Sequence, residues 1–167
     1  MAFNFNNKRH WTWNPKTNAI TYTKDSIIIE YNRSTLDSTV IQIDRAFIND
    51  KFWLLIPFQL IWDEGLTISN PIKAKAPISK KQTNKITLTY SNNVGYTPGD
   101  AYDLFYNDNY VIEEWIFRKG NADEPSLINT FENYQDFNGI KIALEHKNAE
   151  GTRNLKFTDV KISTNGQ

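Results

Sequence analysis

Side chains that could act as nucleophiles or bases are few in this sequence. Cysteine is absent, which excludes thiolate nucleophiles, disulfides and cysteine-based zinc sites. The two histidines, His10 and His146, are the only side chains whose ordinary pKa lies near neutrality. His146 shares the apolar face of a strand predicted for residues 139–146, which is more typical of a structural histidine than of a base. The sequence has no Gly-x-Ser-x-Gly motif and no phosphate-binding glycine loop, so we expect no catalytic centre.

Neighbouring carboxylates are the next candidates for chemistry. Glu113 and Glu114 lie in a predicted strand, where adjacent side chains point to opposite faces and cannot act on one substrate. The turns "YNDNY" and "NADEP" carry oxygen ligands for calcium, but residues of these types are common in turns for backbone reasons alone. We therefore predict no metal and no cofactor.

Charge limits the partners. The chain has 19 Lys and Arg and 19 Asp and Glu, so it lacks the basic excess of a nucleic-acid binder. No apolar run reaches the roughly 20 residues of a transmembrane helix, so we expect no transmembrane segment. Lysines between residues 73 and 85 form a local basic patch, which is either simply solvated or meets anionic lipid headgroups.

The richest apolar stretch is "KFWLLIPFQLIW", residues 51–62. At 100° per residue, Phe47, Phe52 and Leu55 fall on one face, which predicts a helix from Asp44, as N-cap, to about Ile56. Pro57 disfavours helix at the residue before it and is expected to end the helix. Trp53 then points away from the apolar face, so either another segment covers it or it contacts a ligand.

These aromatics define a candidate apolar binding site. Its predicted wall consists of Phe52, Trp53, Leu55, Phe58 and Trp62, facing Trp115, Phe117, Ile142 and Leu144 of a sheet. Trp11 and Trp13 share one strand face; they are either a sugar-stacking platform or core residues.

Most of the remaining chain alternates between apolar and polar residues, as strands do. Strands are predicted at residues 9–14, 19–23, 26–31, 39–43, 85–90, 101–106, 110–117, 139–146 and 153–163, the last with a bulge near Thr158 or Asp159. Short turns between them favour antiparallel pairing; in one of them Pro98 and Gly99 suit a type II turn. Residues 63–85 are expected to form a long loop or flap. The length favours a single domain, residues 1–167.

Three segments carry a resemblance to a known family: "FINDKFWLLIPFQLIWD", "GYTPGDAYDLFYNDNYVIEEWIFRKG" and "FENYQDFNGIKIALEHKNAEGTRNLKFTDVKI". From about Trp11 to Ile162 the chain resembles an uncharacterised family of Gram-negative envelope proteins related to the outer-membrane lipoprotein carriers LolA and LolB. The resemblance implies a mainly β (α+β) fold, in which a curved antiparallel sheet forms an incomplete half barrel with a short helical segment over its concave face. It also implies a periplasmic or outer-membrane-associated protein, and we expect that an upstream signal or anchor segment is missing from this sequence.

Three functions follow. The first is a non-enzymatic envelope protein that binds a lipid, acyl chain or other apolar ligand in the concave face. The second is a structural or protein-interaction module with a fully packed core, which binds an envelope partner. The third, an enzyme, lacks a constellation of residues that would carry it.

Overall fold

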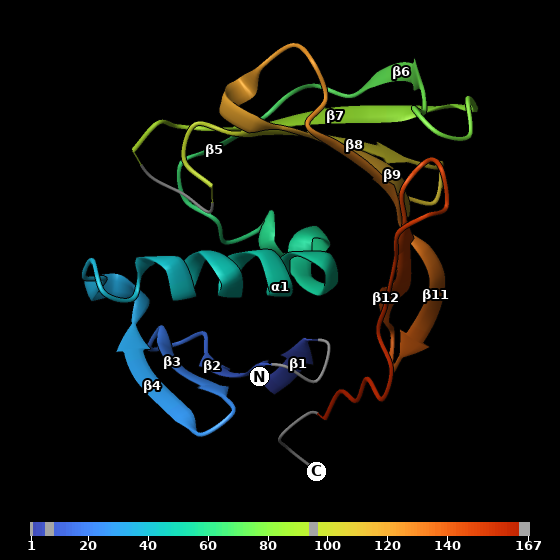
Figure 1. Cartoon of the computed structure of the whole chain (residues 1–167). Coiled ribbons are helices and arrows are strands. Elements are labelled where there is room, and N and C mark those ends of the chain that lie inside the picture. The colour runs from blue at the N-terminus through green and yellow to red at the C-terminus, as the bar shows by residue number, and fades with distance from the viewer. Residues whose placement is uncertain (1, 6–8, 94–96, 164–167) are drawn as a thin grey trace. The chain divides into compact units, whose positions relative to one another are not determined.

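The computed structural model describes residues 2–5, 9–93 and 97–163. The protein is mainly β, with 45% of residues in strands and 16% in helices, and the described strands form antiparallel sheets (Figure 1). This coarse prediction from the sequence is confirmed. The described strands do not close into a barrel. Within the same ranges, no helix is both long and apolar enough to cross a bilayer.

The chain divides into two compact units, Met1–Trp53 and Leu54–Gln167. The boundary lies inside the single α-helix of the described residues, α1 (Ile41–Gln59), so each unit contains one part of that helix. Because the boundary does not fall in a linker, it does not test the prediction of one domain over residues 1–167.

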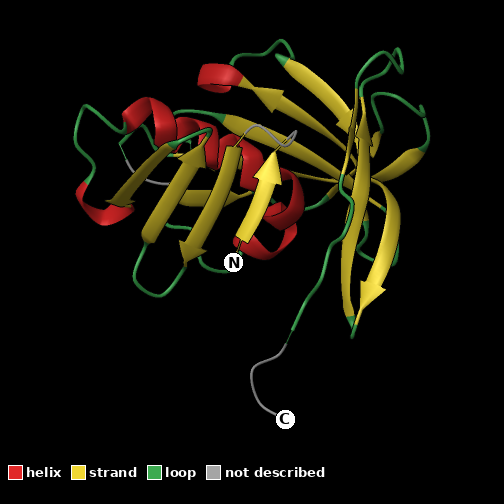
Figure 2. Ribbon diagram, turned by 60° about the horizontal axis from the view of Figure 1, so that its bottom comes forward, coloured by secondary structure: helices red, strands yellow, loops and turns green. Residues whose placement is uncertain are grey.

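Unit 1 contains a four-stranded antiparallel sheet whose strands are neighbours in the order of the chain, as Figure 2 shows near the N-terminus. Its elements are β1 (Ala2–Phe5), β2 (Arg9–Asn14), β3 (Ala19–Lys24), β4 (Ile27–Asn32) and the 3-10 helix η1 (Arg33–Thr35). Asn18 and Asp25, in the turns on either side of β3, have positive φ, a conformation that Asn and Asp tolerate better than most residues.

Trp11 and Trp13 form the core of unit 1. They are 0% and 6% exposed, and their rings lie 5.5 and 5.7 Å from the ring of Phe47 on α1, in edge-to-face arrangements. Such buried pairs stabilise the contact between sheet and helix. The alternative of a sugar-stacking platform at these two tryptophans is therefore wrong, because neither ring face is accessible.

Helix α1 begins earlier than predicted. Within residues 39–43, predicted as a short strand, Ile41–Ile43 belong to its first turn, and the Asp44 N–H already donates to the Val40 carbonyl at 2.8 Å. Asp44 is therefore not the N-cap. Its buried carboxylate instead accepts from Arg33 Nε at 2.8 Å and from the Tyr31 hydroxyl at 3.2 Å, which ties the start of the helix to the preceding chain.

The helix also continues past Pro57 to Gln59, which corrects the predicted end at Ile56. Proline removes one backbone donor and disfavours helix before it. Here the contacts of the last turn outweigh that cost. Phe58 packs against buried Leu54, and the Gln59 side chain donates to Asp63 Oδ2 at 3.1 Å while the Asp63 N–H donates to the Gln59 carbonyl at 3.0 Å.

The middle of α1 is buried on all sides, since every residue from Asp50 to Leu54 is at most 9% exposed. Two of these residues carry charge. Asp50 accepts two bonds from Arg9, at 2.6 and 2.7 Å, and one from Trp11 Nε1 at 2.9 Å. Lys51 places its ammonium 4.6 Å from the centre of the Trp13 ring. Ion pairing and a cation–π contact thus allow a charged helix segment to be buried.

Unit 2 contains two further antiparallel sheets. The first is formed by β5 (Leu66–Ile68), β6 (Ile72–Lys75), β7 (Gln82–Tyr90), β8 (Ala101–Tyr106), β9 (Ile112–Arg118) and β10 (Leu127–Thr130), with the 3-10 helix η2 (Lys119–Asn121) after β9. The second is formed by β11 (Glu132–Phe137), β12 (Ile140–Lys147) and β13 (Asn154–Lys156).

The segment predicted as a loop, residues 63–85, contains β5, β6 and the first residues of β7. Both β5 and β6 pair with β7, and Ser69 continues the pairing: its N–H donates to the Thr87 carbonyl and its Oγ accepts the Thr87 N–H, each at 2.9 Å. Pro71 lies just before β6, at the outside of the sheet, where a missing donor is tolerated. Pro71 and Pro77 flank β6, whose pairing within the described residues is with β7 alone.

One extended segment joins the two sheets of unit 2. Residues Leu127–Thr130 pair with β9, and after Phe131 the same segment pairs with β12. The Phe131 N–H still donates to the Glu113 carbonyl at 2.7 Å, while Thr130 Oγ1 accepts the Lys147 N–H at 3.0 Å. The change of partner therefore occurs within two residues, where Figure 1 shows β9 and β12 next to each other.

Candidate functional site

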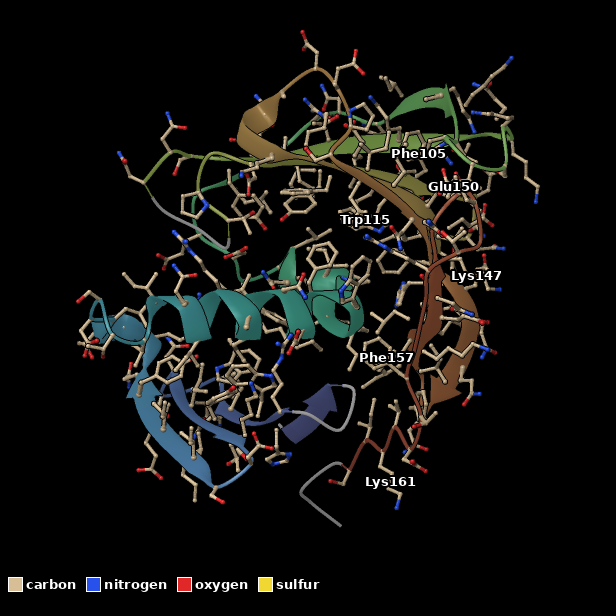
Figure 3. The ribbon with its side chains drawn as sticks, viewed as in Figure 1. Phe105, Trp115, Lys147, Glu150, Phe157 and Lys161 are labelled. Atoms are coloured by element: carbon tan, nitrogen blue, oxygen red, sulfur yellow. The ribbon has the colours of Figure 1, made fainter. Side chains whose placement is uncertain are left out.

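A row of aromatic side chains lies on one face of the first sheet of unit 2. Leu88 lies directly opposite Tyr102, and Leu104 lies directly opposite Trp115. Directly opposed residues of neighbouring strands point to the same face of a sheet, so these side chains share one face. The rings of this aromatic row, Tyr90, Tyr102, Trp115 and Phe117, are in contact, with centroid distances of 6.1 Å from Tyr90 to Tyr102, 5.7 Å from Tyr102 to Trp115 and 5.1 Å from Tyr102 to Phe117. Figure 3 shows Trp115 on the side of the sheet that faces the end of α1 within this unit.

Polar groups meet the aromatic row at the tyrosine hydroxyls. Tyr90 donates to Asp63 Oδ2 at 2.7 Å, and the hydroxyls of Tyr102 and Thr97 lie 3.0 Å apart. Burial raises the pKa of both tyrosines well above the ordinary value, and Asp63 raises that of Tyr90 further. Both hydroxyls therefore stay protonated at neutral pH. The row combines a large apolar surface with a few fixed polar groups, a composition typical of small-molecule sites.

A second apolar group, the helix-end cluster, lies between the C-terminal turn of α1 and the second sheet. Leu54, Ile142 and Leu144 are its buried centre. Leu55 and Phe58 of the helix and Phe157 after β13 pack against it but stay partly accessible. Phe157 is labelled in Figure 3. The predicted pairing of the helix with Ile142 and Leu144 is therefore present in the structure.

The five predicted wall residues, together with Trp115 and Phe117 of the facing sheet, are distributed over four places. Leu55 and Phe58 belong to the helix-end cluster, and Trp115 and Phe117 belong to the aromatic row. Phe52 and Trp53 lie in unit 1, buried, with their rings edge to face at 5.4 Å. Trp62 is 53% exposed in the turn after α1, because the chain turns away there while Asp63 is held by Gln59 and Tyr90. An exposed ring does not line a buried wall.

Sequence reasoning missed Tyr90 and Tyr102, although a signal for both was present. Each is in phase with a leucine that is fully buried, Leu88 for Tyr90 and Leu104 for Tyr102. Alternation alone therefore places them on the core face.

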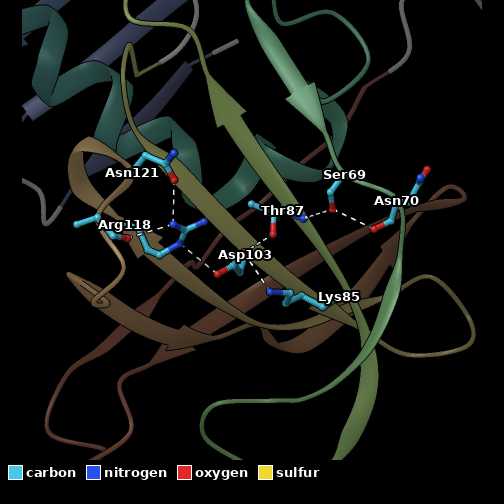
Figure 4. Close-up of polar contacts among 8 residues, drawn as sticks. Ser69, Asn70, Lys85, Thr87, Asp103, Arg118 and Asn121 are labelled. Carbon is cyan, nitrogen blue, oxygen red and sulfur yellow. Dashed lines mark hydrogen bonds and ion pairs between the residues drawn. The ribbon is translucent and has the colours of Figure 1, made fainter.

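The opposite face of the same sheet carries a polar cluster around Asp103, shown in Figure 4. The carboxylate accepts from the Thr87 hydroxyl at 2.5 Å and pairs with Lys85 Nζ at 3.6 Å and Arg118 Nε at 3.3 Å. Arg118 also donates to Asn121 Oδ1 at 2.8 Å. These bonds join β7, β8 and β9 and hold the loop after β9. The buried Asp103 carboxylate is therefore fully explained by a structural role.

The two neighbouring carboxylates of β9, Glu113 and Glu114, have separate partners. Glu114 is 3% exposed and accepts two backbone N–H groups, from Ile78 at 2.6 Å and Ser79 at 2.9 Å. Glu113 accepts from Asn107 Nδ2 at 2.9 Å. Both carboxylates therefore hold loops. In the described residues no three His, Asp or Glu side chains are grouped so that they could hold a metal ion.

His146 is fully buried. Its Nδ1 lies 3.1 Å from the Thr130 carbonyl, which can only accept, so the neutral ring carries its proton on Nδ1. The rings of Phe131 and Phe157 contact it edge-on at 4.5 and 5.9 Å. Burial lowers the pKa of His146 to about 4. At neutral pH it is an uncharged core residue, as its place on an apolar strand face indicates.

Comparison with known proteins assigns the chain to no family. No family model matches the chain, and neither a curated protein nor a solved structure matches it. The resemblance to lipoprotein carriers stays a prediction.

Proposed function

We propose that unit 2 binds a lipid, an acyl chain or another apolar ligand against the aromatic row. The observation that supports this most directly is the row itself: four contacting aromatic rings on one sheet face, with polar partners at the tyrosine hydroxyls. An extended apolar surface with few directional groups suits a ligand that is itself long and apolar. Binding of this kind needs no catalytic residue.

In this proposal the binding surface is the concave face of an incomplete half barrel. The change of strand partner at Phe131 supports it, because a strand shared by two sheets bends the surface that they form. The course of β7, β8, β9 and β12 in Figure 1 is consistent with such curvature. The partly accessible side chains Leu55, Phe58 and Phe117 are the first contacts for an entering ligand.

The same proposal places the protein in the cell envelope, periplasmic or associated with the outer membrane, where lipids and lipoproteins pass between membranes. The support for this location is the resemblance of three sequence segments to envelope proteins. Detection of the native protein in a periplasmic or outer-membrane fraction tests it, and its recovery in the cytoplasmic fraction contradicts it.

The second candidate function is a structural or protein-interaction module with a fully packed core. Burial favours it, since Phe52, Trp53 and Trp115 are only 5%, 9% and 2% exposed. A packed interior leaves no room for an acyl chain. The two functions differ in whether an apolar molecule is bound, which one experiment decides.

The experiment measures binding of a fluorescent fatty acid to delipidated protein and identifies co-purified lipid by native mass spectrometry. The apolar-ligand function requires saturable binding that weakens in Phe58→Ser and Phe117→Ser. Trp62→Ala is the matched control, because it removes an exposed ring outside both clusters and leaves binding unchanged. Absence of both probe binding and bound lipid refutes the proposal and favours the interaction module.

A further inference from the structure

Tyr110, in the hairpin between β8 and β9, combines two unfavourable features. It is 84% exposed, and its φ is 59°, in the left-handed region. Glycine and asparagine adopt this conformation readily, whereas a bulky aromatic residue there is a genuine outlier. Backbone strain of this kind gathers at functional positions, where the side chain is retained for a contact it makes.

The turn itself does not need the tyrosine ring. The Tyr110 N–H donates to the Asn107 carbonyl at 2.9 Å, and the Asn107 N–H donates to the Val111 carbonyl at 3.0 Å. Asn107 Oδ1 accepts two more backbone N–H groups, from Asn109 at 2.9 Å and Val111 at 3.2 Å. Backbone bonds and one asparagine side chain thus hold the turn, and a glycine at position 110 would keep all of them.

The ring of Tyr110 is nevertheless held in a defined orientation by a neighbouring ring. It stacks on Tyr106 with a centroid distance of 6.1 Å and an angle of 17° between the planes. The strand register shifts between Phe105 and Tyr106, and such bulges redirect side chains. The result is an exposed aromatic platform, Tyr106 with Tyr110, whose outer ring presents most of its surface to solvent.

Polar side chains lie next to the platform. The register pairs Lys73 with Asn84 and Asn84 with Tyr106, which places these three side chains in a row across β6, β7 and β8. Asp108, in the turn, accepts from Asn84 Nδ2 at 3.0 Å and from Lys73 Nζ at 3.3 Å. Ammonium, amide and carboxylate thus surround one edge of the platform, and the two charges cancel.

We propose that Tyr106 and Tyr110, with Lys73, Asn84 and Asp108, form a binding site for the ring of a neutral sugar. A pyranose offers an apolar C–H face for stacking on an exposed aromatic ring and hydroxyls for both donors and acceptors at its edge. The balanced Lys73–Asp108 pair disfavours phosphate-bearing ligands, which need an excess of positive charge. The site does not depend on the apolar-ligand function, because its residues lie outside the aromatic row and the helix-end cluster.

The test is titration of the full, isotopically labelled chain with cellohexaose, chitohexaose and mannohexaose at millimolar concentration, followed by amide NMR shifts. We expect at least one of them to shift the amides of residues 105–111, 73 and 84. Tyr110→Gly keeps the turn conformation and lowers that affinity by about tenfold or more, equivalent to about 1.4 kcal/mol. Tyr110→Phe keeps the ring and the affinity.

Trp62→Ala is the control, since it removes another exposed ring of unit 2 and leaves sugar affinity unchanged. Tyr110→Gly also keeps fatty-acid binding, which separates this site from the proposed apolar one. The inference is overturned if none of the three saccharides shifts the turn amides, or if Tyr110→Gly binds as the wild type does. Capture of a protein through Tyr110 without any saccharide shift equally overturns it.

Discussion

Protonation of His146 at acid pH is expected to destabilise the protein. The folded state holds the ring neutral, with a pKa of about 4, whereas an unfolded chain has the ordinary value of 6.5. Between these values the unfolded state binds more protons, so the free energy of unfolding falls as the pH drops through this window. Above pH 6.5 the contribution is fully present. At about 1.4 kcal/mol per pKa unit, lowering the pH from 7 to 4 removes about 3 kcal/mol.

The assay is urea denaturation of the wild type and of His146→Asn at several pH values in this window. Asparagine retains a donor for the Thr130 carbonyl but does not titrate, so the variant loses about 3 kcal/mol less than the wild type over the same interval. Carboxylates whose pKa is lowered by lysine partners, such as Glu132, are present in both proteins and cancel in the comparison. Equal pH dependence in the wild type and His146→Asn would refute the reasoning.

Substitutions at three positions test other contacts, each by chemical denaturation. Asp50→Ala leaves the partly exposed Arg9 guanidinium and the buried Trp11 Nε1 without their acceptor and is expected to cost about 1–3 kcal/mol; a loss below about 0.5 kcal/mol would contradict the role of this carboxylate. Glu114→Ala leaves two loop N–H groups without their acceptor and is expected to cost about 1–3 kcal/mol, whereas Glu114→Gln, which keeps one acceptor, costs less. Pro57→Ala restores the donor for the Trp53 carbonyl and is expected to stabilise by up to about 3 kcal/mol; destabilisation would show that the proline ring itself is needed for packing.

Alternation of residue types was sufficient to place most strands. The predicted strand at residues 139–146 corresponds to β12, and the strands around the "YNDNY" turn correspond to β8 and β9. Gly99 has the positive φ of 81° that a type II turn needs at its third position. In β12 the pattern reflects burial, because Ile142, Leu144 and His146 share one face and are buried, whereas β8 is buried on both faces.

The predictions failed where distant contacts override local preference. The end of α1 was placed before Pro57, but contacts with Asp63 and with the second sheet of unit 2 continue the helix to Gln59. The strands β5 and β6 within residues 63–85 pair with β7 (Gln82–Tyr90), and pairing between separated residues is not visible in a local pattern. In the last segment, β13 ends at Lys156, and Asp159, where a bulge was predicted, has a φ of 55°.

For the candidate site, the sequence predicts which residues belong to apolar groups better than it predicts which of them lie together. Trp115, Phe117, Leu55 and Phe58 lie in the two apolar groups of unit 2, as their phase in strand and helix indicates. The exposure of Trp62 depends on the direction of a turn, which no periodic pattern specifies. The left-handed φ of Tyr110 could not be predicted either, because turn sequences normally place Gly or Asn at such positions.

Because the two sheets of unit 2 share one segment, their strand registers are not independent of each other. In a strand the side-chain period is two, so a slip of one residue moves every side chain to the other face. Leu127–Thr130 and Glu132–Phe137 are separated by Phe131 alone, so a slip in one hairpin would carry an error into the other. Correct pairing of β9 with β10 therefore sets the phase of β11 against β12. The two sheets could each misalign, but because their registers are linked, one correct register fixes the other. Misfolded states in which only one sheet is shifted are thereby disfavoured.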